Sequence, residues 1–342
     1  SASSYALTIN GNSQTGTVLL SGNSASVTSN QRITVSAGTL AISHGGALGD
    51  SSTSYYTTVA SGATLDLQGA ISVAEKINLN GGTVKTSTGS ATLSGVVVLG
   101  ANSTVDVTGT QLTLSNVISG SGFGITKAGS GIAILSAANT YTGATTLSAG
   151  TLVVTDAAGL GDTTGATTIN GGILDLRAAA SENLTLAGGT LKTTTGSGST
   201  SGTVTLNGNS TIDVTGTLTL SGVLSGAYSI TKEGTGTLVL SGSNTYSGGT
   251  TINAGIVRAG SASAVGTSAV TVASGAALDL YGQAISNNLS LAGQYSSTIG
   301  ALTDGSGSGT ASGAITMTGA TSFGGANAFT ISGAISGAYN LT

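Results

Sequence analysis

Acidic side chains are the residues of this sequence that come nearest to a catalytic pattern. Asp66, Asp175 and Asp279 each stand in an LDL tripeptide, and Asp106 and Asp213 stand in VDV and IDV. Successive side chains of a strand point to opposite faces, so an acid between two apolar residues is predicted to face solvent. Glycoside hydrolysis needs two carboxylates within about 10 Å of each other. The recurrence of single acids therefore predicts a repeated solvated face rather than a catalytic pair.

Other residue types that support chemistry are sparse. His44, the only histidine, lies in AISHGGALGD, where a turn is predicted, and there is no cysteine. A metal site or a Ser-His-Asp triad would lack partners. Asp304 begins DGSGSG, which lacks the recurring aspartate of calcium-binding repeats. We predict no catalytic, cofactor-binding or metal-binding residues.

Two tyrosines and two lysines recur in matching contexts. Lys127 and Lys232 stand in ITK, and Tyr141 and Tyr246 stand in NTY. An exposed tyrosine could stack on a sugar ring, which makes Tyr141 and Tyr246 candidate surface contacts. The alternative, which we favour, is that each tyrosine packs over a turn between coils.

A long internal repeat contains these residues. ITKAGSGIAILSAANTYTGATTLSAGTLVV at 125–154 returns as ITKEGTGTLVLSGSNTYSGGTTINAGIVRA at 230–259. Aliphatic residues alternate with polar ones at period two, as in strands with one buried face. Shorter motifs such as Leu147-Ser-Ala-Gly150-Thr-Leu152 recur about every 20 residues. We predict an all-β fold, a single-stranded right-handed parallel β-helix (β-solenoid) of about 16 coils of about 20 residues. Five coils, at about 4.8 Å each, would separate the LDL acids by roughly 24 Å.

The repeats predict a single domain. Residues 1–342 are expected to form one continuous β-helix repeat domain, with long repeats at roughly 1–115, 116–225 and 226–342. The final residues, ISGAISGAYNLT, match LSGVLSGAYSIT at 220–231 and stop where the next ITK passage would begin. We expect the chain to be a fragment of a longer protein.

Composition excludes several classes of partner. Only 6% of residues are charged, the formal net charge is −4, and 57 residues are glycine. Scattered basic residues give no electrostatic basis for binding nucleic acid. No stretch approaches the eighteen consecutive apolar residues of a membrane span, so direct membrane insertion by this segment is not expected.

The passage ITKEGTGTLVLSGSNTYSGGTTINAG resembles the passenger-associated transport repeat of autotransporters, the type V secreted proteins of Gram-negative bacteria. Two copies match, at 125–154 and 230–259, and a degraded copy is TGTVLLSGNS at 15–24 with SAGTLAI at 36–42. The resemblance implies a right-handed parallel β-helix, exported and folded outside the cell, that often serves as a stalk presenting adhesive functions. It brings no catalytic residues.

Three functional hypotheses follow. We favour a structural and adhesive protein, a rod-like stalk segment of an autotransporter-like passenger, on the extracellular surface of a Gram-negative bacterium. Its partners would be a host surface, a glycan or another copy of itself, and it would need no cofactor. The alternative is a self-assembling extracellular fibre subunit that stacks head to tail through unpaired strand edges. A polysaccharide-active β-helix enzyme is the least favoured reading, because acids are not clustered.

Overall fold

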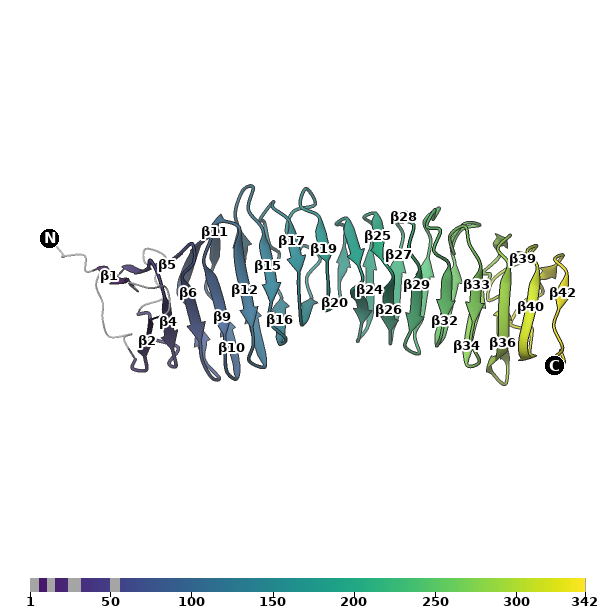
Figure 1. Cartoon of the computed structure of the whole chain (residues 1–342), viewed down its shortest axis with the longest axis horizontal. Coiled ribbons are helices and arrows are strands. Elements are labelled where there is room, and N and C mark those ends of the chain that lie inside the picture. Colours follow the sequence, from purple (N-terminus) through teal and green to yellow (C-terminus); the bar gives the residue numbers. More distant parts are fainter. Residues whose placement is uncertain (1–5, 11–15, 24–31, 50–55, 342) are drawn as a thin grey trace. The chain divides into compact units, whose positions relative to one another are not determined.

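The computed structural model describes residues 6–10, 16–23, 32–49 and 56–341. It divides into two compact units, Ser1–Leu174 and Asp175–Thr342. All regular secondary structure of the described residues is β-strand, and the strands make about 15 turns of a parallel β-solenoid (Figure 1). The predicted fold class is confirmed. Residues 15 and 24 of the degraded first copy, and residue 50 of ALGD, lie outside the described residues.

Three series of parallel strands form the first unit, and in each series one coil adds one strand to the strand before it. The first series is β1 (Ala6–Ile9), β3 (Arg32–Val35), β5 (Tyr56–Ala60), β8 (Lys76–Asn80), β11 (Val97–Ala101) and β14 (Ile118–Ser119). The second is β2 (Thr17–Leu20), β4 (Thr39–Ile42), β6 (Thr64–Leu67), β9 (Thr83–Thr86), β12 (Ser103–Val107), β15 (Ile125–Ala128), β17 (Thr145–Leu147) and β19 (Thr167–Ile169). The third is β7 (Ser72–Val73), β10 (Ser90–Leu93), β13 (Gln111–Leu114), β16 (Ile132–Leu135) and β18 (Thr151–Val154). The division between the units falls within β20 (Ile173–Leu176).

The second unit repeats this arrangement. One series is β23 (Thr190–Thr193), β26 (Ser210–Val214), β29 (Ile230–Glu233), β31 (Thr250–Ile252), β33 (Val270–Val272), β36 (Leu289–Ser296), β40 (Ile315–Thr321) and β42 (Ile335–Ser336). Another is β21 (Ala179–Ala180), β24 (Ser197–Thr200), β27 (Thr217–Leu220), β30 (Thr237–Leu240), β32 (Gly255–Ala259), β34 (Ala276–Asp279) and β38 (Leu302–Thr303). Two shorter series are β22 (Leu184–Ala187), β25 (Val204–Gly208) and β28 (Leu224–Gly226), and β35 (Ala284–Ile285), β39 (Thr310–Ala311) and β41 (Thr330–Ile331). An antiparallel pair joins β36 to β37 (Ile299–Gly300).

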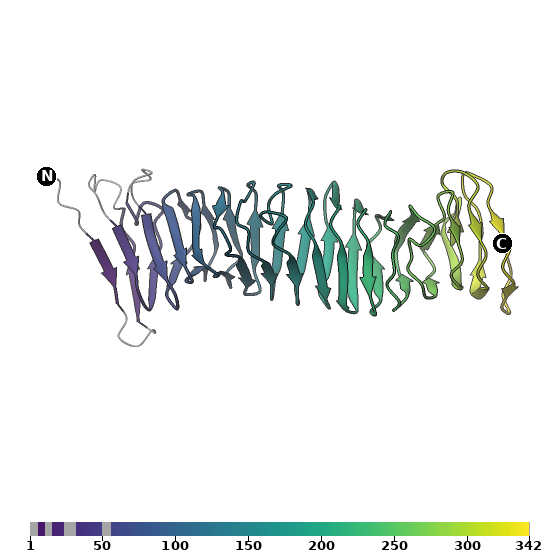
Figure 2. The ribbon, with the colours of Figure 1, turned by 90° about the horizontal axis from the view of Figure 1, so that it is seen from above.

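Neighbouring strands of each unit lie side by side (Figure 2), and their pairing places equivalent residues of successive coils beside one another. Leu218 pairs with Leu238, and Leu238 with Val257, and all three side chains are fully buried. Alternation at period two sends such residues to the inside of the coil. The sequence pattern therefore determines both the strand and the face that it buries.

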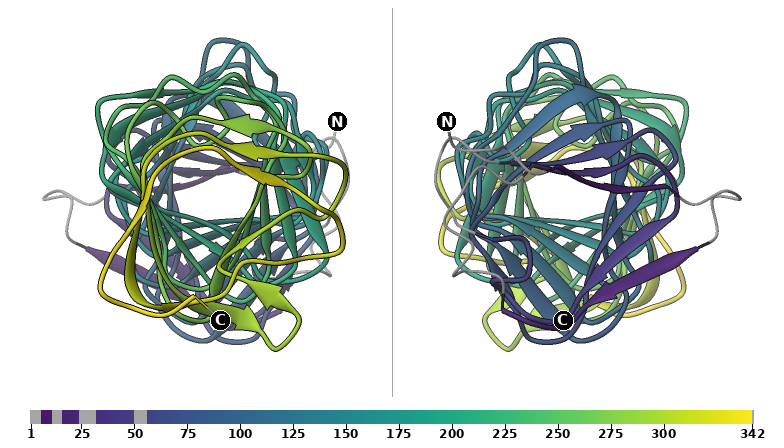
Figure 3. Two further views of the ribbon diagram at one scale, coloured as in Figure 1. Left: turned by 90° about the vertical axis from the view of Figure 1, so that its right-hand side faces the viewer. Right: turned by 90° about the vertical axis from the view of Figure 1, so that its left-hand side faces the viewer.

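The coils of each unit wind around an interior (Figure 3), and buried side chains stack in columns there. One column of the first unit consists of Leu40, Leu65, Val84, Val105, Lys127, Leu147 and Ile169. Its counterpart in the second unit consists of Leu191, Ile212, Lys232, Ile252, Val272, Leu291 and Met317. Each column contains one lysine among apolar neighbours.

Glycines form the tightest corner of the second unit. A Cβ on Gly222 would collide with the carbonyl oxygen of Gly202, and one on Gly242 with the carbonyl oxygen of Gly222. These positions recur every 20 residues, at 202, 222 and 242, so the coils can stack closely only if the corner has no side chain.

Among the described residues, the structure contains no helix with the length and apolar character needed to span a membrane.

Candidate functional site

The recurring lysines are buried rather than exposed. Lys127 lies in β15 between Val105 and Leu147 of the adjacent coils, and Lys127 and Lys232 are both 0% exposed. The Nζ of Lys127 donates hydrogen bonds at 2.6, 2.8 and 3.2 Å to the carbonyl oxygens of Ala128, Gly129 and Ala149. The Nζ of Lys232 donates at 2.7, 2.8 and 3.2 Å to those of Glu233, Gly234 and Ala254. Each ammonium thus ties two successive turns together.

Burial changes the acidity of both lysines. Desolvation lowers the pKa of Lys127 to about 8, and the negative charge of Asp106 opposes this shift. Desolvation likewise lowers the pKa of Lys232 to about 8, against Asp213 and Glu233. A buried amine loses the water that stabilises its charge, and the three carbonyl dipoles replace only part of it.

Tyr141 and Tyr246 are also fully buried, so neither forms the surface contact that the sequence offered as a candidate. The hydroxyls of Tyr141 and Thr145 lie 2.6 Å apart, and those of Tyr246 and Thr250 lie 2.5 Å apart. Burial raises the pKa of Tyr246. The packing interpretation is the correct one, because the phenol finds its hydrogen-bond partner inside the coil.

An asparagine two residues before each tyrosine joins neighbouring coils. Asn139 Oδ1 accepts from the backbone N–H of Ile118 at 2.8 Å, and its Nδ2 donates to the carbonyl of Gly159 at 2.6 Å. Asn244 bonds in the same way to Leu224 and Ala264. The repeated NTY motif is therefore a structural element of the solenoid, and both copies use it identically.

The LDL acids contradict the prediction of a solvated face. Asp66, Asp175 and Asp279 are 5%, 2% and 3% exposed. Asp66 accepts from the backbone N–H and hydroxyl of Ser87 on the next coil, at 2.9 and 2.7 Å. Asp175 accepts in the same way from Thr194, at 3.1 and 2.6 Å. Each acid stands on the outer side of its strand, but the following turn covers it, and two-residue alternation cannot reveal that cover.

Asp106 and Asp213 make ion pairs on the outer face. Asp106 lies 3.0 Å from the Nζ of Lys85, and Asp213 lies 2.6 Å from the Nζ of Lys192. The four side chains are 21–30% exposed, so their outward position was predicted correctly. Residues Lys85 and Asp106, like Lys192 and Asp213, are register partners on neighbouring strands. The pairs are ladder contacts rather than catalytic groups.

Glu75 is a buried acid that the sequence analysis missed. It is 3% exposed, its Oε1 accepts from the hydroxyl of Thr57 at 2.9 Å, and within the described chain its Oε2 has no hydrogen-bond partner. Desolvation raises its pKa to about 7, and the bond from Thr57 opposes this rise. Comparing AEKINL, SENLTL and SNNLSL places Glu182 and Asn287 at the corresponding positions of the later repeats, which is the signal that could have identified it.

His44 and Asp304 both have turn roles. The Nδ1 of the exposed His44 accepts from the backbone N–H of Gly46 at 3.1 Å, as expected of a turn residue. The carboxylate of Asp304 is fully buried and accepts from the backbone N–H groups of Gly282, Ser306 and Gly309. Among the described residues, no cluster of three histidine, cysteine, aspartate or glutamate side chains could hold a metal ion.

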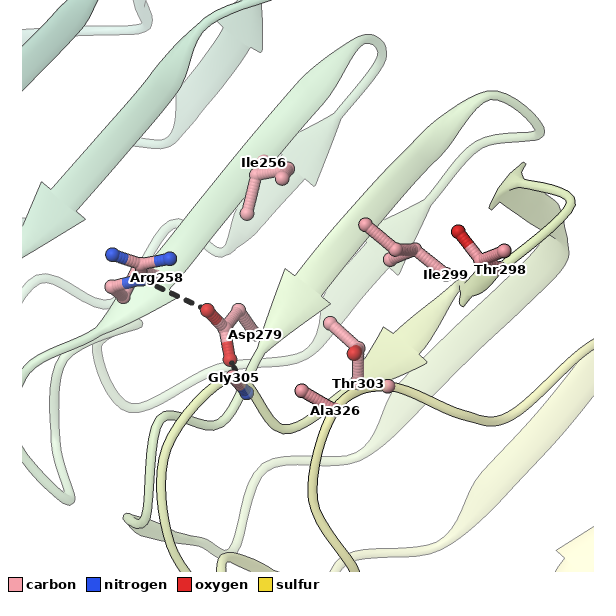
Figure 4. Close-up of a pocket in the computed structure, with 9 residues that line it drawn as sticks. Ile256, Arg258, Asp279, Thr298, Ile299, Thr303, Gly305 and Ala326 are labelled. Carbon is pink, nitrogen blue, oxygen red and sulfur yellow. Dashed lines mark hydrogen bonds and ion pairs between the residues drawn. The ribbon is translucent and has the colours of Figure 1, made fainter.

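A groove on the second unit has a volume of about 380 Å³ and is open to a ligand from solution (Figure 4). Strands β32 and β34 supply Ile256, Arg258 and Asp279 on one side. The turn before β37 and strand β37 supply Thr298 and Ile299 on the other, with Thr303 between them. The Nε of Arg258 donates to Asp279 at 2.9 Å. Sequence reasoning did not find this groove, because its two walls come from segments about 40 residues apart.

The comparisons with known proteins agree with this structure. The model of the passenger-associated-transport-repeat family matches residues 125–154 and 230–259. The adhesin BmaC autotransporter of Brucella suis biovar 1 (strain 1330) is 40% identical over 110 residues, which are 30% of this chain and 3% of the adhesin. The chain therefore spans a small part of that relative. No solved structure matches the chain. The matched repeats, the similarity to an autotransporter adhesin and the parallel β-solenoid together confirm the predicted resemblance to an autotransporter passenger with passenger-associated transport repeats.

Proposed function

We propose that this chain is a stalk-forming segment of an adhesive protein on the surface of a Gram-negative bacterium. The observation that carries the proposal is the pair of matched repeats, whose lysine, tyrosine and asparagine side chains make the same buried contacts in both copies. Such contacts support rigidity and offer no catalytic group. The relative that shares part of this sequence is named as an adhesin.

Adhesion is tested with the purified chain coupled to fluorescent beads. The beads are expected to attach to cultured epithelial cells more often than beads carrying the heat-unfolded chain. Equal attachment of the two preparations would remove the support for an adhesive role. Labelling of intact, unpermeabilised bacteria by an antibody against this chain, with loss of the label after protease treatment of whole cells, tests the surface location.

The stalk function rests on the further proposal that residues 1–342 form one continuous β-helix domain. Its support is the long repeat, whose two matching copies at 125–154 and 230–259 lie on either side of the division between the units. Negative-stain electron microscopy should show single short rods. Two separately moving bodies would contradict the continuous domain, and long uniform filaments would favour the head-to-tail fibre instead.

A further inference from the structure

The coil that carries the groove departs from the regular repeat. Leu289 of β36 pairs with Ile315 of β40, a separation of 26 residues, whereas Val204 of β25 pairs with Leu224 of β28, a separation of 20. The longer coil contains the antiparallel pair of β36 and β37, which raises one wall of the groove. The preceding coils of the second unit are uniform in length, and a local insertion among them is where a binding function is expected, because the repeat itself does not need it.

Arg258 is held in one orientation in this groove. Its Nε donates to Asp279, and its Cζ lies 4.5 Å from the centre of the Tyr281 ring. In the part of the chain that the structure describes, neither terminal nitrogen of Arg258 makes a hydrogen bond. Arg177 differs, since both its Nε and one terminal nitrogen bond to Asp175, at 2.8 and 2.6 Å. The guanidinium of Arg258 is therefore positioned and still has donors available.

Tyr281 reaches the guanidinium through a strained backbone. Its φ of 47° is the only positive value at a non-glycine residue among the described residues. The carboxylate of Asp279 holds this conformation by accepting from the N–H of Tyr281 at 3.1 Å. Non-glycine residues in this region cost about 1 kcal/mol or more, and such strain gathers at ligand-binding sites. In the two earlier repeats the LDL motif is followed by Gln68 and Arg177, so the tyrosine is specific to this copy.

The charge of the groove excludes a strongly ionic ligand. Among the residues that line it, Arg258 and Asp279 are the charged ones, and they form an ion pair. The remaining lining residues are threonine, isoleucine, alanine and glycine. A paired arginine, hydroxyl groups and apolar patches complement a ligand that has hydroxyl acceptors and apolar C–H surfaces, and no net charge.

From this arrangement we propose that the groove binds a neutral saccharide. The terminal nitrogens of Arg258 donate to sugar oxygens, the hydroxyl of Thr298 at the rim makes a further hydrogen bond, and Ile256 and Ile299 contact the apolar face of a ring. The inference rests on the proposed adhesive function for its biological meaning, since it names the chemical class of the partner. The binding itself does not depend on that function.

The test is a heteronuclear NMR titration of the whole chain with lactose, cellotriose, chitotriose and mannotriose, each at about 10 mM, a concentration that detects millimolar affinity. At least one of the four should shift the amide signals of Arg258, Thr298 and Ile299. Sialyllactose and trigalacturonate provide charged comparisons. If none of the four neutral sugars shifts these signals, or a charged one binds more tightly, the proposal fails.

Matched variants locate the site. Arg258→Met should weaken binding about ten-fold or more, because a charged donor is lost. Arg177→Met removes an arginine whose side chain has the same 34% exposure and also pairs with an aspartate, and it should leave affinity unchanged. Equal losses in the two variants would assign the effect to folding and overturn the site. Tyr281→Gly removes the ring that orients the guanidinium of Arg258, so it should weaken binding. Because glycine also relieves the strained backbone, the variant should not have a lower unfolding temperature.

Failures of the two proposals can be told apart. Saccharide binding that is absent while beads still attach to cells would overturn the groove assignment alone. Saccharide binding that persists while beads fail to attach would overturn the adhesive function alone.

Discussion

At the level of single residues, the feature that the two matched repeats share is a set of buried polar side chains. Lys127 and Lys232 were visible in the sequence as recurring residues, yet their burial was not, since lysine is rarely fully buried. Each occupies a core position because its stem fills an aliphatic column while its ammonium reaches three carbonyl oxygens of adjacent turns. This arrangement makes two predictions about stability.

Replacing Lys127 by methionine tests the carbonyl contacts. Methionine fills the column but leaves three carbonyl oxygens without their donor, so the free energy of unfolding at pH 7 should fall by about 1–3 kcal/mol. The pKa of Lys127 is about 8 when folded, against 10.5 for an unperturbed lysine. Between these values the unfolded chain binds more protons, so stability relative to the variant should rise with pH. Urea unfolding at pH 7, 8.5 and 10 measures both effects.

Lys85→Met is the matched control for this experiment. Lys85 is 30% exposed and pairs with Asp106, so its loss should change the free energy of unfolding by less than about 1 kcal/mol. A Lys127→Met variant as stable as the control would show that the three carbonyl contacts only offset the cost of burying the ammonium.

Glu75→Gln tests the buried carboxyl group. The pKa of Glu75 is raised to about 7 from 4.5, so the folded chain binds more protons between these values. The free energy of unfolding contributed by Glu75 is therefore fully present below pH 4.5 and is lost as the pH rises to 7. The variant should be more stable than the parent at pH 8 by about 1–3 kcal/mol, and no more stable at pH 4.5. Thermal unfolding followed by circular dichroism at both pH values measures this.

Asn287 gives this prediction a natural precedent, because an amide at the corresponding position donates to the carbonyl oxygens of Gly266 and Ser268. Glu233→Gln serves as the control, since its carboxylate makes an exposed hydrogen bond with Asn253. If both variants respond equally to pH, burial of Glu75 is not the cause.

Corners limit the stacking of strands at the level of elements. Alternating aliphatic residues predict where the strands form, but the distance between coils depends on the size of the residues at the corners. Gly222→Ala should lower the free energy of unfolding by about 1–3 kcal/mol, since its Cβ would meet the carbonyl oxygen of Gly202. Gly22→Ala, where a Cβ would meet nothing within 4 Å, should have little effect. Unfolding midpoints in guanidinium chloride compare the two; a Gly222→Ala midpoint equal to that of Gly22→Ala would contradict the close corner.

Electrostatics contributes little at the scale of the whole molecule. Only 6% of residues are charged, and in each ion pair of the described residues the basic side chain is 27–34% exposed. Raising sodium chloride from about 0.05 to 1 M should therefore change the free energy of unfolding by less than about 1 kcal/mol. Denaturant titrations at the two salt concentrations test this. A larger fall would mean that ion pairs, rather than packed columns and backbone ladders, stabilise the solenoid.

The sequence by itself determined the strands, the length of a coil and the parallel solenoid, because alternation and a repeat of about 20 residues are local properties. Tertiary structure alone decided which polar residues are buried. Asp66 was expected to be solvated, but Ser87 of the next coil covers it. Tyr141 offered an exposed alternative, yet Thr145 bonds to it inside the coil. The groove also depends on the stacking of coils, since Ile299 and Arg258 line it from different coils. Contacts between coils join residues about 20 positions apart, and no local pattern records which of them will meet.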